Sequence, residues 1–282
     1  MEVLLRKLIP RLSLYNYPFL IALYEKYAVV RYRKKFNQVI VFRGANFIIG
    51  KDVTLFPSVF LGSYESGELD ILLNHDFPED LVFWDIGANV GLYSVLLASK
   101  YPNSRVVAFE PNMKVHSLLK KNLYLNKLSN VVIEEVALSN LVGKGNLLTQ
   151  EFRLGAGKLD LNSDKLESDI NLVVTTGKTF LKLHPESIPN LVKIDVEGHE
   201  PEVIQGMLEV IQEHKPTLTI EVFLNLWTGD RHLLWEDTIS NLFQIYESAI
   251  LVSDGKSKEI SVWSQNYLTG GMQTLIFGLD SR

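Results

Sequence analysis

The chain has 282 residues, 46% of them hydrophobic, and a formal net charge of −5 at pH 7. This length and composition suit one large globular α/β domain with an appendage. The absence of cysteine excludes disulfides, thiolate zinc sites and cysteine nucleophiles. Nothing in the sequence responds to the redox compartment, so a cytoplasmic location is the default expectation.

Residues 1–36 form a basic leader. Eight Lys or Arg stand there against Glu2 and Glu25, a charge of +6 that leaves −11 for the rest of the chain. Leucines near helical spacing predict an amphipathic helix, interrupted at Pro10. No apolar run approaches the roughly 18–20 residues that span a membrane, and the interspersed basic residues do not suit a signal peptide. Contact with an anionic membrane surface or a partner, and packing against the main domain, are both open interpretations.

The main domain is predicted to be an α/β sheet. Short strands are expected before it, so residues 1–63 are assigned to an N-terminal extension and residues 64–282 to the main domain. Near-continuous apolar strands alternate with helical patterns from residue 81 onward, which is typical of a parallel sheet covered on both faces. Residues 139–177 break this rhythm, and their glycine-containing turns predict a β-rich insertion or a flap.

The stretch "VFWDIGANVG", residues 82–91, places Gly87 and Gly91 after an apolar strand. In an open parallel sheet, ligands bind beyond the carboxyl ends of the strands, and the first strand-to-helix turn is part of that crevice. Glycines also end strands for steric reasons alone, so the pair by itself leaves both interpretations open.

Two further features concern the kind of ligand. Glu110 closes the second strand, where nucleotide-binding domains place a carboxylate for the ribose hydroxyls, although an exposed strand-end glutamate is also possible. The turn lacks the G-x-G-x-x-G spacing that suits a pyrophosphate, and Asp85 would repel one. An acid there favours a ligand with a cationic amine and no phosphate, such as S-adenosylmethionine.

Three segments, "FWDIGANVGLYS", "VVAFEPNMKVHSLLKKNLYLN" and "LVKIDVEGHEPEVIQG", resemble the FkbM family of S-adenosylmethionine-dependent methyltransferases. The resemblance covers about residues 64–225, and "KIDVEGHE" is its most specific part. It implies the seven-stranded Rossmann-like class I methyltransferase sheet, with "QTLIFGL" as an antiparallel strand beside the fifth. It also implies methylation of hydroxyl groups, commonly on sugars, polysaccharides or glycosylated natural products.

The same resemblance implies a set of cofactor-binding residues. The turn after the first strand would line the methionine part, the end of the second strand the ribose, the end of the third strand the adenine, and Asp195 the sulfonium. In chain order these positions are Asp85, Gly87, Asn89, Gly91, Glu110, Pro111, Asn112, Val136, Ala137 and Asp195. Glu65 matches an upstream acid of the family, and we interpret it as a solvated residue at a helix start.

The sequence departs from the family at one place. The family usually reads Thr-Leu-Asp before the fourth strand, whereas this chain has Thr176, Gly177 and Lys178. An acidic position has become basic, which weakens any inference about the acceptor by analogy.

Candidate catalytic residues lie in "DVEGHE", and no spacing of histidines and carboxylates indicates a metal site. A sugar hydroxyl is a poor nucleophile near neutrality, so a general base would help, and the candidates are Asp195, Glu197 and His199. His199 titrates near neutrality, although a surface histidine at a helix start is an equal alternative. Glu200 and Glu202 are interpreted as first-turn acids that face the helix dipole.

The leading interpretation is an O-methyltransferase with a carbohydrate or glycosylated acceptor. An RNA ribose methyltransferase is the second, but an acidic body disfavours wide phosphate contact. A non-catalytic cofactor-binding partner protein is a third, and a nicotinamide dehydrogenase is disfavoured by the glycine spacing. Trp227, Trp235 and Trp263 follow the fifth strand and suit either sugar stacking or core packing.

Overall fold

A computed structural model describes residues 27, 29–32, 34–52, 55–60, 62, 64–150, 153–160, 170–223, 230–253, 255–267 and 272–279. Residues 1–26, which carry most of the predicted leader helix, and Trp227 lie outside these ranges. Within the described residues, no helix combines the length and the apolarity that crossing a bilayer requires.

The described residues form one eight-stranded sheet in the order β13-β12-β14-β11-β10-β3-β4-β5. The parallel centre consists of β3 (Val82–Ile86), β4 (Arg105–Phe109), β5 (Val131–Glu134), β10 (Leu191–Ile194) and β11 (Thr217–Phe223). The last strand, β14 (Met272–Phe277), runs antiparallel between β11 and β12 (Ala249–Ser253). The predicted seven-strand sheet and its antiparallel insertion are therefore confirmed, and β13 (Lys256–Ile260) adds an eighth strand at the edge.

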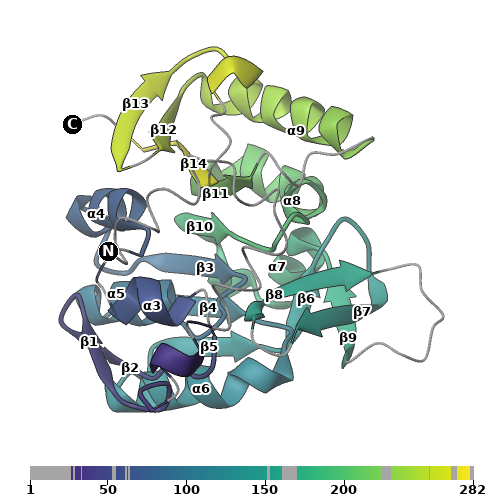
Figure 1. Cartoon of the computed structure of the whole chain (residues 1–282). Coiled ribbons are helices and arrows are strands. Elements are labelled where there is room, and N and C mark those ends of the chain that lie inside the picture. The colour runs from purple at the N-terminus through teal and green to yellow at the C-terminus, as the bar shows by residue number, and fades with distance from the viewer. Residues whose placement is uncertain are drawn as a thin grey trace.

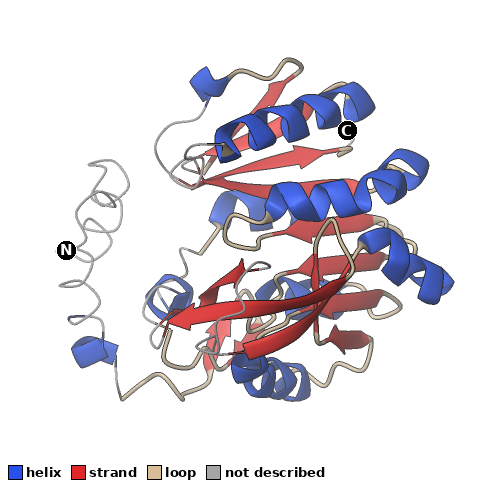
Figure 2. Ribbon diagram, turned by 90° about the vertical axis from the view of Figure 1, so that its right-hand side faces the viewer, coloured by secondary structure: helices blue, strands red, loops and turns tan. Residues whose placement is uncertain are grey.

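Helices cover both faces of this sheet (Figure 1). One face carries α3 (Leu55–Phe60), α4 (Ser66–Asn74), α5 (Leu92–Lys100) and α6 (Met113–Leu125). The other carries α7 (Gly177–Leu183), which leads into the short η2 (Pro185–Ser187), α8 (Glu200–His214) and α9 (Arg231–Tyr246). Figure 2 looks onto this second face, where the helices lie in front of the strands.

Alternation along the central strands explains the two hydrophobic cores. Phe83 packs into the core under α5, whereas its neighbour Trp84 packs into the core under α7 and α8. The same alternation separates Val106 and Val107 on β4. Because both faces are covered, nearly every position of these strands is buried, as their apolar sequences predicted.

A second sheet of four strands has the order β6-β9-β7-β8. It consists of β6 (Val136–Leu138), β7 (Gly143–Gln150), β8 (Arg153–Asp160) and β9 (Ile170–Thr175). The sequence "NVVIEEVAL" was predicted to be one strand, but it divides at Glu135, so that β5 ends the large sheet and β6 joins the small one.

Residues before the main domain contribute to the first core. The hairpin of β1 (Ile40–Phe42) and β2 (Ala45–Phe47) is antiparallel. Tyr32 and Phe36 are buried, and they belong to the same core as Phe83. Tyr32 and Phe36 lie within the predicted leader, so this part of it packs on the sheet domain.

Candidate active site

The glycine turn after β3 presses against the end of β10. Gly87 has a φ of 84°, and a Cβ atom there would lie 1.9 Å from the carbonyl oxygen of Asp195. Gly91 has the same φ of 84° and precedes α5, where a Cβ would lie 2.3 Å from Leu119. Both glycines are therefore needed to bring two strand ends and a helix together, whatever ligand the turn holds.

Asp85 connects the end of β3 to the start of α5. Its carboxylate is buried, and Oδ2 accepts hydrogen bonds from the Ser94 backbone N–H at 3.0 Å and the Ser94 hydroxyl at 2.6 Å. Burial raises the pKa of Asp85, while Lys193 and the Ser94 hydrogen bonds oppose this. The position predicted to meet a cationic amine is thus also a structural link.

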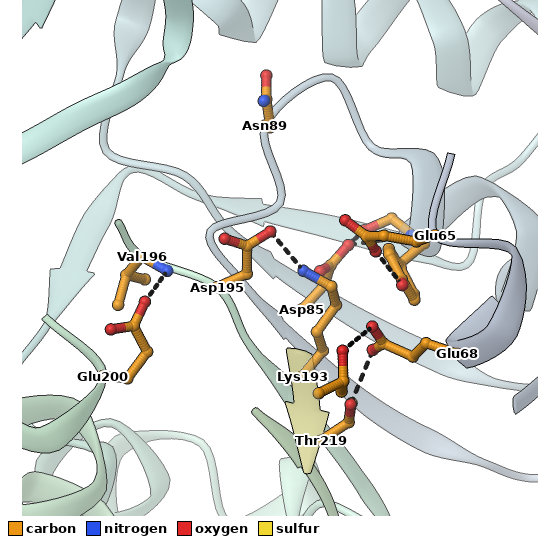
Figure 3. A network of polar contacts seen from close by, with 12 residues as sticks. Glu65, Glu68, Asp85, Asn89, Lys193, Asp195, Val196, Glu200 and Thr219 are labelled. Carbon is orange, nitrogen blue, oxygen red and sulfur yellow. Dashed lines mark hydrogen bonds and ion pairs between the residues drawn. The ribbon is translucent and has the colours of Figure 1, made fainter. Parts of the chain in front are cut away.

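Glu110 supports the turn from the neighbouring strand. One carboxylate oxygen accepts from the Asn89 N–H at 2.8 Å, and the other from the Asn112 N–H at 2.7 Å. Burial raises the pKa of Glu110 to about 7, against these two hydrogen bonds. Asn89 has a φ of 51°, and its side chain points away from the other labelled residues (Figure 3). Each carboxylate oxygen of Glu110 keeps a second lone pair, which can accept from a ribose hydroxyl.

Polar side chains gather on the α4 side of the central strands, and we call them the interior polar cluster (Figure 3). Alternation puts Asp85, Lys193, Thr219, Glu221 and Thr274 on that face, because the residues between them belong to the opposite core. Helix α4 and the residue before it cover the face and add Glu65 and Glu68. Asp195 follows β10 and completes the cluster.

Lys193 is the positive centre of this cluster. Its side chain is 5% exposed, and its ammonium lies 2.8 Å from Asp195 Oδ2 and 4.6 Å from the ring centre of Tyr93. Burial alone would lower the pKa of Lys193, but the surrounding carboxylates, Asp195 first, raise it well above its usual value. The lysine therefore stays charged and compensates part of the negative charge of its neighbours.

Asp195 and Glu221 are hydrogen-bonded carboxyl groups whose pKa values shift in opposite directions. Burial alone would raise the pKa of Asp195, but the Lys193 ammonium and a hydrogen bond with Glu221 lower it. The pKa of Glu221 is raised well above its usual value by burial and by the negative charge of Asp195. The two carboxyl groups therefore titrate as a pair, in which Lys193 favours the ionised form of Asp195.

Glu65 and Glu68 contact the interior polar cluster from the side of α4. Glu68 is buried and accepts from Thr219 Oγ1 at 2.7 Å and Thr274 Oγ1 at 3.1 Å. Glu65 accepts a hydrogen bond from the Tyr93 hydroxyl and another from Tyr64. The prediction that Glu65 stands at a helix start is confirmed, but its interpretation as a solvated residue is wrong, because it is half-buried and faces two tyrosines.

A pocket opens beside the cluster at the carboxyl ends of β3 and β10. Its polar lining comes from Asp85, Asn89, Lys193 and Asp195, and Tyr64 and Tyr93 contribute their rings. Leu55, Val90 and Leu92 add apolar surface. The pocket therefore combines carboxylates with aromatic and aliphatic walls, and Lys193, the cation in this lining, is already paired with Asp195.

The loop after β10 separates the three predicted catalytic residues. Asp195 lines the pocket, whereas Glu197 is exposed, with a φ of 56°. His199 is not among the residues that line the pocket; one ring nitrogen lies 2.9 Å from Ser139 Oγ and the other 3.6 Å from Glu202. Burial lowers the pKa of His199. A catalytic role for His199 or Glu197 stays a prediction.

Glu200 and Glu202 hold this loop in place. Glu200 is 2% exposed, and its Oε1 accepts from the Val196 N–H at 3.0 Å (Figure 3). The same oxygen accepts from the Gly198 N–H at 3.1 Å. Glu202 pairs with Arg231 of α9 at 2.7 Å, and the same arginine donates to the Gly198 carbonyl. The two acids lie in the first turn of α8 as expected, but their contacts are to the loop and to α9.

The other predicted positions lie around the turn and the small sheet. Asn112 is buried and caps α6 by accepting from the Lys114 N–H, and Pro111 beside it is half-buried. Val136 packs against the second core, and Ala137 against the small sheet. These positions do not line the pocket beside Asp195. Their role toward an adenine ring stays a prediction.

Two remaining expectations concern the unusual lysine and the tryptophans. Lys178 is exposed and pairs with Glu209 of α8 at 2.6 Å, and it does not line the pocket. Trp235 is fully buried in the second core, as the core-packing alternative predicted. Trp263 donates to Glu236 at 3.1 Å.

Lys193, Glu221, Tyr64 and Tyr93 are the site residues that the sequence analysis missed. The signal was present in "LVKID" and "TLTIEVF", where a charged or hydroxyl side chain occupies every second position facing one side. A lysine that shares a central strand with Leu191, Val192 and Ile194 is costly to bury unless it is paired. This pattern indicates a buried ion pair.

Comparisons with known proteins identify the family. The model of the methyltransferase FkbM domain matches residues 85–244, more than half of the chain. Hexuronic acid methyltransferase AglP of Haloferax volcanii is 30% identical over 149 residues, which cover 52% of this chain and 59% of that protein. Methyltransferase sdnD of Sordaria araneosa is 29% identical over 180 residues, which cover 52% of this chain and 68% of that protein.

One solved structure adds a comparison at the level of the backbone. The FkbM methyltransferase from Methylobacillus flagellatus KT has 15% sequence identity and a TM-score of 0.45, with 89% of this chain and 53% of that chain covered. The match of the family model to residues 85–244 includes the glycine turn, Glu110 and the "KIDVEGHE" segment. The predicted family is thus confirmed: the chain belongs to the FkbM methyltransferase family.

Proposed function

We propose that this protein is an S-adenosylmethionine-dependent O-methyltransferase that acts on a hydroxyl group of a sugar, a polysaccharide or a glycosylated small molecule. The observation that carries the proposal is the pocket at the ends of β3 and β10, with Asp85 and Asp195 in its lining. In an open α/β sheet, the carboxyl ends of the parallel strands are where a ligand is expected.

The donor set fits S-adenosylmethionine rather than a dinucleotide. Two carboxylates and aromatic rings line the pocket, and its lysine is paired with Asp195 at 2.8 Å. Such a lining attracts ammonium and sulfonium groups and repels phosphates. When bound, S-adenosylmethionine supplies an electrophilic methyl group on a sulfonium. Asp85, Asn89 and Asp195 would hold its methionine part, and Glu110 its ribose.

The residues of the chain contribute charge and position. Lys193 keeps Asp195 ionised, so that a negative charge faces the pocket without a change of protonation. Glu110 fixes the turn through the Asn89 and Asn112 N–H groups. Glu200 and Arg231 fix the loop that carries Asp195. Holding the acceptor and the methyl group in line in this way lowers the activation barrier of the displacement. The reduction is on the order of 7–11 kcal/mol at best.

The carbohydrate acceptor is proposed from the relative that shares 30% identity and is named for hexuronic acid. The matched region spans 59% of that relative, so the acceptor is taken as a class, a hydroxyl on a sugar-like molecule, and not as that compound. The acidic cluster beside the pocket favours a neutral hydroxyl as the acceptor group, because the negative charge of the cluster would repel a carboxylate.

The binding test uses titration calorimetry with S-adenosylmethionine and, in parallel, NAD. We expect S-adenosylmethionine alone to bind. Asp85→Asn and Glu110→Ala should each weaken it by about 1.5–3 kcal/mol, because each removes a charge-assisted hydrogen bond. Asp80→Asn, an exposed aspartate just before β3, is the matched control and should bind like the wild type.

The activity test uses cofactor with a labelled methyl group and a panel of hexuronic acids, neutral sugars and glycosides, with products identified by mass spectrometry. Label in an ether of a sugar hydroxyl supports the proposal. Tight binding of NAD, or binding of neither cofactor by a folded protein, contradicts it.

A further inference from the structure

We infer that Glu65 is the general base that accepts the proton of the acceptor hydroxyl, and that the hydroxyls of Tyr64 and Tyr93 hold its carboxylate in position. The inference deepens the proposed function and rests on it. In the step, the acceptor O–H bond breaks and its proton bonds to a Glu65 carboxylate oxygen. The electron pair left on the acceptor oxygen forms the bond to the methyl carbon, and the pair of the carbon–sulfur bond leaves with the sulfur.

The backbone at Glu65 is the first argument. It precedes α4 with a φ of 36° and a ψ of 42°, in the left-handed region that residues other than glycine seldom adopt. Its side chain makes no capping hydrogen bond to α4. Glu65 thus has a strained backbone and does not cap the helix, so its other contacts must hold it in this conformation. Backbone strain of this kind is concentrated at functional sites.

The position of the carboxylate is the second argument. Carboxylate oxygens of Glu65, Asp195 and Glu221 all lie within 4.8 Å of one another. A hydroxyl oxygen can lie about 2.7 Å from each of two carboxylate oxygens that are no more than 4.8 Å apart. Asp195, Tyr64 and Tyr93 line the pocket, and Glu65 lies behind this lining, hydrogen-bonded to both tyrosines. The proposal therefore places the acceptor hydroxyl at the wall formed by Asp195 and the two tyrosines, where it donates its one proton to Glu65.

The other carboxylates nearby already have ion-pair or hydrogen-bond partners other than phenol hydroxyls. Asp195 forms an ion pair with Lys193 at 2.8 Å, and Glu221 is hydrogen-bonded to Asp195. Asp85 accepts two hydrogen bonds from Ser94. Glu68 accepts from two threonines. Of these acids, Glu65 alone has only phenol hydroxyls as its hydrogen-bond partners among the described contacts.

The titration of Glu65 agrees with this role. The groups that face it are Tyr64 beside it, Tyr93 on α5, Glu68 on α4, Lys193 and Asp195 on and after β10, and Glu221 on β11. Burial, Glu68 and Asp195 raise the pKa of Glu65 to about 8, while Lys193 and Tyr64 oppose them. A base with a pKa near the working pH accepts a proton most effectively. The tyrosine pKa values are raised, so both phenols remain hydrogen-bond donors.

The first experiment needs no acceptor. Titration calorimetry with S-adenosylmethionine at pH 7.5, in buffers of different ionisation enthalpy, counts the protons released on binding. A cation bound beside Glu65 lowers its pKa, so the wild type should release up to about one proton per cofactor. Glu65→Gln should lose most of this release and bind S-adenosylmethionine about three- to tenfold more weakly, because the cation favours the ionised carboxylate. Glu68→Gln makes the same change at a carboxylate whose partners are threonines, and it should keep the release.

The second experiment measures turnover with the acceptor found in the panel, or with D-glucuronic acid as a probe. Glu65→Gln should lose about 10²–10⁴-fold in kcat together with the rise of the rate with pH. In Glu65→Ala, added formate should restore part of the rate. His199→Ala should keep the pH profile of the wild type.

The outcomes separate the two proposals. If the wild type does not bind S-adenosylmethionine, the proposed function fails. If it binds and Glu65→Gln releases as many protons as the wild type, or turns over at the same rate, the base is another group and the inference is overturned.

Discussion

At the scale of single residues, Gly87 and Gly44 have the same backbone conformation in different surroundings. Their φ values are 84° and 83°, but a Cβ at Gly87 would lie 1.9 Å from the Asp195 carbonyl oxygen, whereas nothing lies within 4 Å at Gly44. Comparing substitutions at Gly87 and Gly44 therefore separates two contributions to the free energy of unfolding, the backbone conformation and the contact between β3 and β10.

Gly87→Ala is predicted to destabilise the protein far more than Gly44→Ala. Gly44→Ala should cost about 1–2 kcal/mol, the penalty of a Cβ in the left-handed region. Gly87→Ala adds a clash with backbone that cannot move without displacing Asp195, so its loss should be at least twice as large, and cofactor binding should weaken. Urea unfolding measures both. Equal losses in the two variants would mean that the strand ends do not touch as described.

At the scale of elements, α4 is attached to the sheet by polar contacts as well as by Leu69 and Leu72. Glu68 joins it to β11 through Thr219 and to β14 through Thr274. Buried hydroxyls that lose their partner cost roughly 1–3 kcal/mol each. The helix that follows Glu65 thus depends on a second carboxylate three residues later.

Glu68→Ala is accordingly predicted to lower the free energy of unfolding by about 2–4 kcal/mol, because both threonine hydroxyls lose their acceptor. Asp70→Ala is the matched control on the exposed side of the same helix. Its ion pair with Arg43 lies at the surface, so the change should cost less than about 1 kcal/mol. Chemical denaturation of both variants tests this, and a Glu68→Ala protein as stable as Asp70→Ala would show that α4 is held by its leucines alone.

At the scale of the whole molecule, the sequence was informative wherever the structure follows a local period. Apolar strands alternating with amphipathic helices predicted the parallel sheet. The resemblance to the FkbM family, rather than a local period, correctly implied that "QTLIFGL" is the antiparallel strand beside the fifth. The division of "NVVIEEVAL" was not predictable in this way, because Glu135 is one residue in an otherwise continuous strand pattern and the partner of β6 is the distant β9.

The same distinction applies to the site. Asp85, Asn89, Glu110 and Asp195 lie close to strand ends, where the position along the chain already implies the position in the sheet. The interior polar cluster depends instead on which helix covers the strands. The contact of Glu68 with Thr274 joins residues at opposite ends of the main domain, and no local pattern specifies it.

The carboxyl groups of the site also determine how the stability of the whole protein depends on pH. Burial raises the pKa of Glu65 to about 8 and the pKa values of Glu110 and Glu200 to about 7, above the usual value of 4.5. A group with a raised pKa in the folded state binds its proton more tightly there than in the unfolded chain. Its contribution to stability is fully present below about pH 4.5 and is lost as the pH rises through 7 to 8.

Other groups act in the opposite direction at lower pH. The pKa of Asp195 is lowered by Lys193 against burial, and the pKa of Glu202 is lowered by Arg231 against burial. Their contribution is present above the usual carboxyl pKa and is lost on further acidification. Burial lowers the pKa of His199, so that its contribution grows as the pH rises through the usual histidine value. His199 alone acts against four glutamates with raised pKa values, Glu65, Glu110, Glu200 and Glu221, so the maximum of stability should lie on the acidic side of neutrality.

The thermal midpoint of the ligand-free protein is therefore predicted to fall between pH 6 and pH 8.5. Of Glu65, Glu110 and Glu200, Glu65 has the highest pKa, so Glu65→Gln should flatten the upper part of the curve, between about pH 7 and pH 8.5. Glu186→Gln, an exposed glutamate beside Arg105, is the matched control and should leave the curve unchanged. S-adenosylmethionine should raise the midpoint more at pH 8.5 than at pH 6, because a cation offsets the carboxylates that ionise in between. Calorimetric scans at several pH values measure all three curves. A midpoint that is constant or rises over this range would mean that these glutamates are ionised in the folded protein at pH 6.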